Sequence, residues 1–241
     1  MAKKTDRASR QPRETREVSR VGVSVRLKAL MYRPATPSQR VLAGAWDRTV
    51  CGFVVGPAGT GKTAGVFGES LMDVIHRGRG ARTIYLTRPT VQAEDTDDMG
   101  FLPGTLQAKF GAWLPAFGDI LGCVSDVTMT ALDPLLDMMP LGYARGRTVR
   151  LGTLIVDEAQ NLTRSQLTLL LSRVGHGGRV MFCGDPDQCD LPRDKWWGGE
   201  LPLLKAIRRL EREPDVRVIR TTPADQMRSG FVTRVLDRMT D

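Results

Sequence analysis

The sequence has few of the residues that hold structural metals or disulfides. Its 241 residues contain four cysteines, none of them in a CxxC pair, and two histidines. These residues are Cys51, Cys123, Cys183, Cys189, His76 and His176. A structural zinc site needs closely paired ligands, so the sequence predicts none. Cys51 and Cys183 lie in apolar, strand-like runs, which favours small buried side chains over a disulfide framework.

Long apolar runs are missing as well. No run approaches the roughly 20 residues that a membrane span needs. The first residues, MAKKTDRASRQPRETREVSR, are polar and lack the apolar core of a secretion signal. We therefore expect a cytoplasmic protein with no membrane partner.

Positive charge is concentrated at the N-terminus. Residues 1–33 carry ten Lys or Arg against three acidic residues, which leaves 25 basic and 24 acidic residues for the rest. The sequence thus predicts a basic, flexible arm over residues 1–33 and a single domain over residues 34–241. Such an arm either contacts phosphate backbones through counterion release or is a solvated leader, and the sequence leaves both open.

Short apolar runs alternate with amphipathic ones after the arm. Strands are predicted at 50–55, 82–87, 153–158, 179–185 and 216–220. Helices are predicted from Ser38 as N-cap, from Lys62, over SQLTLLLSRV, over LPLLKAIRRLERE and over the final SGFVTRVLDRM. Continuous apolar strands between helices are typical of a parallel sheet that is buried on both faces, so we predict a three-layer α/β fold.

The stretch GPAGTGKT, which follows a predicted strand and opens a predicted helix, matches the P-loop pattern completely. Its glycines let successive backbone amides point at phosphate oxygens, and the helix N-terminus adds partial positive charge. Lys62 is expected to neutralise the β- and γ-phosphates, and the Thr63 hydroxyl to ligate Mg²⁺. The predicted nucleotide-binding residues are Gly56, Pro57, Ala58, Gly59, Thr60, Gly61, Lys62 and Thr63.

Two later strands end in acidic and amide side chains. TLIVDEAQ carries Asp157 to the carboxyl end of its strand, where it can hold Mg²⁺ together with Thr63. Glu158 follows and can polarise a water for attack on the γ-phosphate, which favours hydrolysis over transfer to another substrate. The next strand ends FCGDPDQ. If it lies beside the Asp157 strand, Gln188 can sense the γ-phosphate or the water, and Asp185 lies near the metal's outer shell.

Nine motifs in order make the chain resemble the PhoH-like family of P-loop ATPases, which is related to the nucleotide-binding half of superfamily-one helicases. From about Thr36 to Leu236 these are TPSQ, GPAGTGKT, LTRP, GFLPG, ARGRT, VDEAQN, LSRVG, GDPDQCDLP and a final arginine helix. The resemblance implies a RecA-like P-loop domain that uses ATP and Mg²⁺. It also implies RNA or single-stranded DNA as a partner.

The resemblance assigns roles to further residues. It places Gln39 at the adenine and Arg228 at the γ-phosphate as a sensor or finger. Arg88 and Pro89, together with Gly100 to Gly104, resemble the family's signature on the face near the nucleotide or a bound strand. Arg145 and Arg147 match the family's RGRT element. The last motif reads DQMRSG where the family usually has DVVRH, so only Asp225 and Arg228 carry over. WWGGEL stands where the family tends to have SGL, and its Trp196 and Trp197 either stack bases or pack against the body.

These observations predict a Mg²⁺-dependent ATPase coupled to nucleic acid. A complete monomeric helicase closes two such domains around one ATP, and only one fits in this chain. We therefore expect a homo-oligomer, in the form of a ring with a trans-acting arginine such as Arg228. Two alternatives stay open: an ATP-dependent binding or regulatory module with little turnover, and a P-loop kinase.

Overall fold

The structure is a computed structural model. It describes residues 32–75, 83–89 and 135–228, the backbone of residues 16–20 and 23–27, and the separate positions Leu132, Gly230, Phe231 and Arg238. His76, Cys123, the GFLPG motif and most of the predicted final helix lie outside the described residues.

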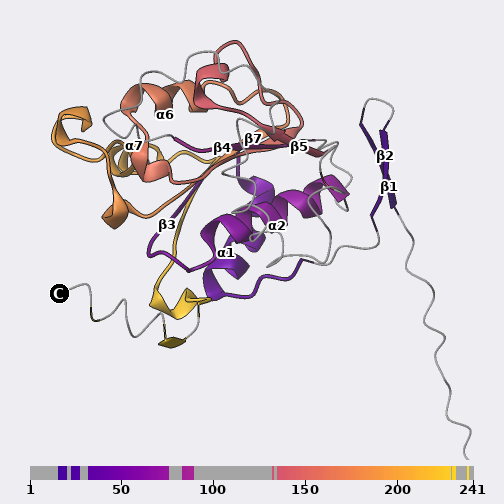
Figure 1. Ribbon diagram of the computed structural model, residues 1–241, viewed down its shortest axis with the longest axis horizontal. Helices are drawn as coiled ribbons and strands as arrows, with labels where there is room; N and C mark the ends of the chain where they lie inside the picture. Colours follow the sequence, from indigo (N-terminus) through magenta and orange to yellow (C-terminus); the bar gives the residue numbers. More distant parts are fainter. Residues whose placement is uncertain are drawn as a thin grey trace, which may run out of the picture.

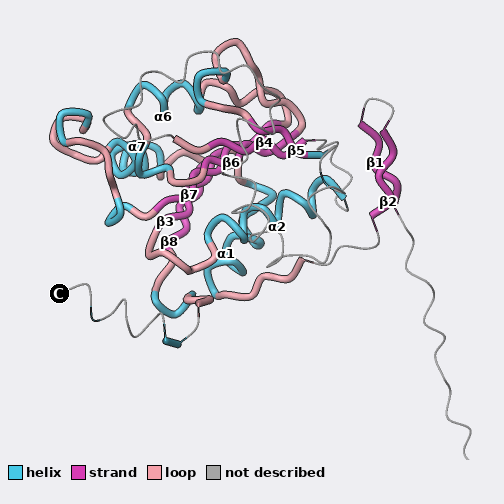
Figure 2. Tube along the Cα trace, viewed as in Figure 1, coloured by secondary structure: helices cyan, strands magenta, loops and turns pink. Residues whose placement is uncertain are grey.

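A six-stranded sheet with all its described strands parallel forms the centre of the fold (Figures 1 and 2), and its order is β5-β4-β6-β7-β3-β8. The strands are β3 (Cys51–Val55), β4 (Thr83–Thr87), β5 (Leu136–Met138), β6 (Gly152–Val156), β7 (Gly178–Gly184) and β8 (Val216–Arg220). Five of them match the predicted strands, and the short β5 was not predicted. The predicted neighbourhood of the FCGDPDQ strand and the Asp157 strand is confirmed, because β7 pairs with β6.

Helices cover both faces of the sheet (Figure 1), which confirms the three-layer α/β fold. The helices are α1 (Pro37–Ala45), α2 (Lys62–Ile75), α6 (Arg164–Leu171) and α7 (Pro202–Leu210). Successive strand side chains point to opposite faces. Val54 and Ile155 accordingly join the core under α1 and α2, whereas Phe53 and Phe182 join the core under α6 and α7. The two phenylalanine rings stack with their centroids 5.2 Å apart.

Helix α1 begins two residues earlier than predicted. Its N-cap is Thr36, whose hydroxyl accepts a hydrogen bond from the Gln39 backbone, while the Gln39 side chain returns to the Thr36 backbone. Pro37 occupies the first helical position, where its missing N–H costs nothing. The prediction of Ser38 as the cap was therefore wrong, because Ser38 already lies in the first turn and bonds to Asp225 instead.

Helix α2 runs close to its neighbours because glycines stand at the contacts. A Cβ atom on Gly68 would collide with the ring of the buried Tyr32, and one on Gly65 would lie 2.9 Å from Cγ of Gln39. The P-loop that precedes α2 is thus fixed to a helix that is buried on most sides.

The N-terminal region contains a pairing that the sequence did not predict. Strands β1 (Arg16–Arg20) and β2 (Val23–Leu27) form an antiparallel hairpin. The flexible arm over residues 1–33 and the domain boundary after it stay predictions. Among the described helices, none is both long and apolar enough to cross a bilayer.

Candidate active site

The loop from Gly56 to Gly61 joins β3 to α2 and forms one wall of a cavity. Gly56, Gly59 and Gly61 have φ angles of 142°, 79° and 71°, a region that only glycine enters without strain. Lys62 Nζ donates to the backbone oxygens of Gly56 and Pro57, each at 2.7 Å. Its ammonium therefore bends back over the loop, and its contact with phosphate stays a prediction.

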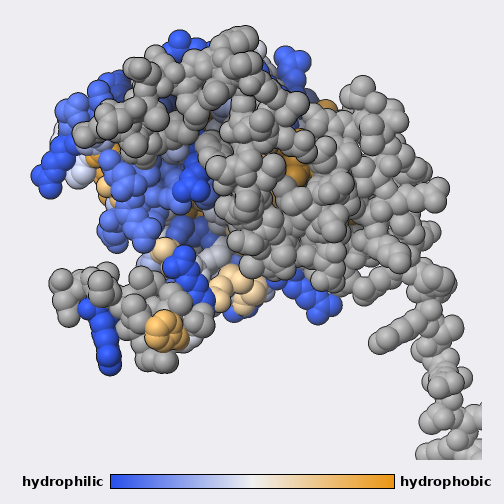
Figure 3. Space-filling model, in the orientation of Figure 1, coloured by the Kyte–Doolittle hydropathy of each residue, from blue (hydrophilic) through white to orange (hydrophobic). Residues whose placement is uncertain are grey.

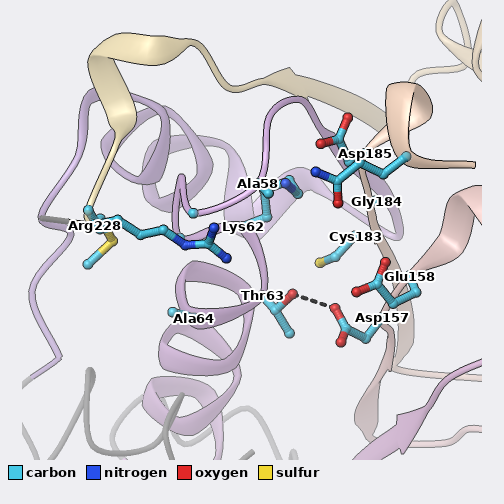
Figure 4. A pocket seen from close by; sticks show the side chains of 14 residues that line it. Ala58, Lys62, Thr63, Ala64, Asp157, Glu158, Cys183, Gly184, Asp185 and Arg228 are labelled. Carbon is cyan, nitrogen blue, oxygen red and sulfur yellow. Dashed lines mark hydrogen bonds between the residues drawn. The ribbon is translucent and has the colours of Figure 1, made fainter. Parts of the chain in front are cut away.

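The side chains of Thr63 and Asp157 are joined by a hydrogen bond. Thr63 Oγ1 donates to Asp157 Oδ1 at 2.7 Å, and Figure 4 shows this bond at the cavity. Thr63 lies in the first turn of α2, which follows β3, whereas Asp157 follows β6. These two strands are not neighbours, because β7 lies between them. The Asp157 amide donates to the oxygen of Thr87 at the end of β4, which fixes the turn that follows β6.

This pair fits a magnesium ion by its chemistry. A hydroxyl and a carboxylate are hard oxygen donors, and Mg²⁺ usually takes one or two protein carboxylates together with phosphate oxygens and waters. Burial raises the pKa of Asp157, and the hydrogen bond from Thr63 opposes that rise. Burial lowers the pKa of Lys62, while the carboxylates of Asp185, Glu158 and Asp157 around it favour the charged form.

Glu158 is held in a conformation that a non-glycine residue rarely adopts. Its φ of 51° and ψ of 41° are left-handed, which costs on the order of 1 kcal/mol or more. One carboxylate oxygen accepts from Arg88 at 3.3 Å, and the other accepts from Gln160 Nε2 at 2.6 Å. The strained backbone turns the carboxylate into the cavity beside Asp157, as Figure 4 shows.

Gln160 connects the acidic residues to the end of the next strand. It is 1% exposed, and its Oε1 accepts from the Asp185 amide at 3.0 Å. Its Nε2, besides binding Glu158, lies 3.3 Å from the backbone oxygen of Gln188. Sequence reasoning singled out no role for Gln160, although it stands in the VDEAQN motif that carries the resemblance.

The segment that follows β8 forms hydrogen bonds with the P-loop on the side opposite Asp157 and Glu158. The Met227 amide donates to the oxygen of Gly59 at 2.9 Å, and Gln226 Nε2 donates to the oxygen of Ala58 at 3.2 Å. A Cβ atom on Gly59 would lie 2.7 Å from Cδ of Arg228, so the arginine side chain covers this glycine. Figure 4 shows Arg228 extending toward Lys62 from the side opposite the carboxylates.

A cavity of about 550 Å³ brings most of the predicted residues together. It is lined by Ala58, Gly59, Gly61, Lys62, Thr63, Ala64, Asp157, Glu158, Cys183, Gly184, Asp185, Gln188, Met227 and Arg228. Gly56, Pro57 and Thr60 belong to the loop but do not line this cavity. The Thr60 hydroxyl bonds instead to Thr221, at 2.8 Å, and to the oxygen of Pro57.

Gln39 lies behind the loop and is only 5% exposed. Its Nε2 donates to the oxygen of Gly61 at 3.0 Å, and its Oε1 accepts from the Ala35 amide at 2.8 Å. The side chain therefore supports the loop in this structure, and its contact with adenine stays a prediction.

The other predicted arginines occupy separate places. Arg88 reaches the cavity through Glu158. Arg147 lies away from the site, where it pairs with Asp137 at 2.5 Å and lies over the ring of Tyr85. Arg145 is exposed and borders a groove on α6.

Comparison with known proteins places this site in a family. The model of the PhoH-like protein family matches residues 31–240. A PhoH-like protein of Mycobacterium tuberculosis is 34% identical over 208 residues, which are 85% of this chain and 57% of that protein. A PhoH-like protein of Bacillus subtilis is 33% identical over 217 residues, covering 87% and 64% respectively.

Protein PhoH of Escherichia coli is 34% identical over 189 residues, or 76% of this chain and 51% of that protein. The chain thus spans between about half and two thirds of the length of these curated relatives. The family match covers the P-loop, the Thr63–Asp157 pair and the segment that carries Arg228. On this evidence the chain belongs to the PhoH-like family of P-loop NTPases.

Proposed function

We propose that this chain binds ATP together with Mg²⁺ and hydrolyses it, and that turnover acts on or is regulated by RNA or single-stranded DNA. The observation that carries the hydrolytic part is the arrangement across β7. There, Thr63 and Asp157 are joined at 2.7 Å, and Glu158 lines the same cavity beside them. A regulatory module would need the phosphate cradle and metal pair but not a strained carboxylate next to them.

Residues on the two walls of the cavity have different roles in the proposed reaction. The P-loop amides and Lys62 hold the β- and γ-phosphates, while Thr63 and Asp157 hold the metal. When bound, Mg²⁺ neutralises phosphate charge and orients the phosphates for in-line attack. Glu158 accepts the proton of the attacking water at a carboxylate oxygen, and Gln188 at the cavity rim orients that water or the γ-phosphate.

Arg228 fits a role within its own chain. Its side chain lies over Gly59 of the same P-loop, so it can stabilise charge on the γ-phosphate without a neighbour. This favours a sensor in cis over the trans-acting finger that the sequence suggested for this residue. A homo-oligomer whose neighbour supplies a different arginine remains part of the proposal.

ATP is the proposed substrate rather than GTP. The family to which the chain belongs supports ATP, and the sequence has no [NT]-K-x-D stretch of the kind that reads guanine.

Phosphate release tests the hydrolytic role. Glu158→Gln keeps size and polarity but cannot take a proton, so we expect ATP binding to persist while kcat falls on the order of 10²–10⁴-fold. Lys62→Ala should abolish binding or turnover. Glu213→Gln, the same change on an exposed turn after α7, is the matched control and should behave like the wild type.

The outcome separates the three candidate functions. Unchanged turnover in Glu158→Gln would overturn hydrolysis by this site. Labelled γ-phosphate on an acceptor molecule, rather than as free phosphate, would indicate a kinase. Binding of ATP by the wild type without release of phosphate, with or without RNA and single-stranded DNA, would indicate the regulatory module.

The oligomer is tested by mass measurement with and without ATP. A wild-type protein that is monomeric at full turnover would overturn the assembly while leaving the ATPase intact.

A further inference from the structure

A cluster of cations surrounds one tryptophan outside the nucleotide site. We define the Trp197 basic cluster as Trp197, Arg164, Lys205 and Arg209. The guanidinium carbons of Arg164 and Arg209 each lie 4.6 Å from the centroid of the Trp197 ring, and Lys205 Nζ lies 5.3 Å from it. The cluster joins α6, α7 and the loop between β7 and α7. Trp197 therefore packs against the body of the protein, which is one of the two alternatives that the sequence left open. The groups that contact its ring include three cations.

Acidic groups offset these cations only in part within the described part of the chain, because Glu200 attracts Lys205 and Arg209 without forming an ion pair with either. The ion pairs found there include none from Arg164, Lys205 or Arg209. The neighbouring carboxylate of Glu200 is occupied by Arg208, whose Nη2 lies 2.5 Å from it. Stacking on an indole offsets part of the repulsion among three like charges, but it does not remove their field.

The cluster is accessible from solvent. Arg164 and Arg209 are exposed, whereas Trp197 and Lys205 are half-buried. Figure 3 shows hydrophilic side chains gathered on the side of the molecule where Figure 1 places α7 and the loop before it. Beside the cluster, Arg193 lies over the ring of Trp196 at 5.4 Å and extends the basic surface.

Two chain segments connect this cluster to the nucleotide cavity. One runs from Glu158 to Arg164, and the other runs from Asp185 to Trp197. They are bonded to each other along the way, because Cys189 Sγ donates to the oxygen of Gln160 at 3.2 Å.

A second bond lies further along the same segments, where the Asp190 amide donates to Asn161 Oδ1 at 2.8 Å. The two segments that lead from the cluster to Glu158 and to Gln188 are thus held together by hydrogen bonds.

We propose that the Trp197 basic cluster binds the phosphodiester backbone of a single-stranded nucleic acid and transmits its presence to the ATP site. A guanidinium that lies over an indole face keeps its N–H edges available for bidentate contact with phosphate oxygens. Spaced cations with aromatic rings beside them suit a strand better than a compact anion. The inference rests on the proposed function, because it names where the nucleic-acid partner docks.

Binding of labelled oligonucleotides tests the cluster directly. The full chain is titrated, without nucleotide, with fluorescent 15-residue oligo(U) and oligo(dT) over a series of salt concentrations. The double variant Arg164→Gln with Arg209→Gln should bind at least tenfold more weakly at low salt. Its slope of log K against log salt should be shallower by about 1.4, since each lost contact to a single strand contributes about 0.7.

The matched control removes two charges at the opposite end of the sheet. Arg48 and Arg150 are exposed and precede β3 and β6, so Arg48→Gln with Arg150→Gln should leave affinity and slope unchanged. The two arms, oligo(U) and oligo(dT), decide between RNA and DNA as the source of the strand. Polyglutamate of equal charge is the third ligand, and equal binding of it would overturn recognition of a nucleic acid.

Strand binding and ATP hydrolysis are measured in separate assays. Failure of the docking site can therefore be distinguished from failure of the proposed function. The cluster variant should keep basal ATP hydrolysis within twofold and lose stimulation by the oligonucleotide. If the wild type binds a strand and the variant binds it equally well, the docking site is wrong while the proposed function stands. If the wild type binds neither strand, the nucleic-acid part of the proposed function fails with it. Strand binding that depends on the cluster in a chain without ATPase activity supports the docking site and overturns the hydrolytic proposal.

Discussion

Replacing Asp225 should loosen the segment that carries Arg228. Asp225 is 1% exposed and accepts hydrogen bonds from the Ser38 amide at 2.8 Å, the Ser38 hydroxyl at 2.7 Å and the Thr222 amide at 2.8 Å. A fourth bond, from the Thr222 hydroxyl, measures 3.2 Å. The carboxylate thereby joins the start of α1 to the chain that leaves β8 and continues over the P-loop.

The magnitude follows from these bonds. A hydrogen bond to a charged group contributes about 1.5–3 kcal/mol, but bonds that share one acceptor are not additive, and the Ser38 hydroxyl has a second acceptor in the oxygen of Arg220. We expect Asp225→Ala to lower the free energy of unfolding by about 3–4 kcal/mol. Ser38→Ala removes one of the four bonds and should cost about 1 kcal/mol.

Urea denaturation followed by circular dichroism measures both variants. The midpoint should fall with an unchanged slope, since the change affects stability and not the surface exposed on unfolding. A loss below about 1 kcal/mol for Asp225→Ala, or an equal loss for the two variants, would refute the assignment of Asp225 as the shared acceptor.

The same carboxylate gives a signed dependence on pH. Although burial alone would raise its pKa, the hydrogen bonds from Ser38 and Thr222 lower the pKa of Asp225 from 3.8 to about 2. Because the folded pKa is below the unfolded one, this contribution is present above pH 4 and is lost as the pH falls toward 2. The stability difference between wild type and Asp225→Asn should therefore shrink by roughly 1–2 kcal/mol between pH 5 and pH 2, allowing for solvent screening. A constant difference would contradict the lowered pKa.

Two further substitutions test the core and the loop. Arg179→Met removes the cation that lies 2.6 Å from the buried Asp73 carboxylate, so thermal denaturation should show a loss of about 3 kcal/mol, and a loss under 1 kcal/mol would contradict the role of this ion pair. Gly59→Ala places a Cβ atom at a φ of 79° and against Arg228, so ATP affinity measured by calorimetry should fall at least tenfold. Gly44→Ala is its control, because a Cβ atom there meets nothing within 4 Å, and the helical position should gain about 0.5–1 kcal/mol with unchanged affinity.

The sequence predicted the sheet and the two walls of the cavity because both depend on local patterns. Five apolar runs gave five parallel strands, and the P-loop pattern fixed the turn before α2. The edge strand β5 escaped prediction because three residues with a central Asp137 show no apolar run. Ser38 was mistaken for the cap because Thr36 and Ser38 are both good caps, and only the contact with Asp225 decides between them.

The contacts that complete the site come from residues far apart in the chain. Nothing local in Gln160 indicates that its amide joins Glu158 to the end of β7. Arg228 was expected at the γ-phosphate from the resemblance, but its position over Gly59 depends on how the chain returns after β8. The cations around Trp197 come from α6 and α7. The two adjacent tryptophans in the sequence could therefore not show by themselves whether they stack on bases or pack against the body of the protein.

The amide of Gln160 is chemically asymmetric, and that asymmetry gives the site a direction. Its nitrogen end can only donate and faces the Glu158 carboxylate, while its oxygen end can only accept and faces the Asp185 amide. Rotating the group by half a turn would set an oxygen against the carboxylate and a nitrogen against an N–H, so both contacts would become repulsive together. The ends of the neighbouring strands β6 and β7 are therefore joined by an amide that fits between them in one orientation only.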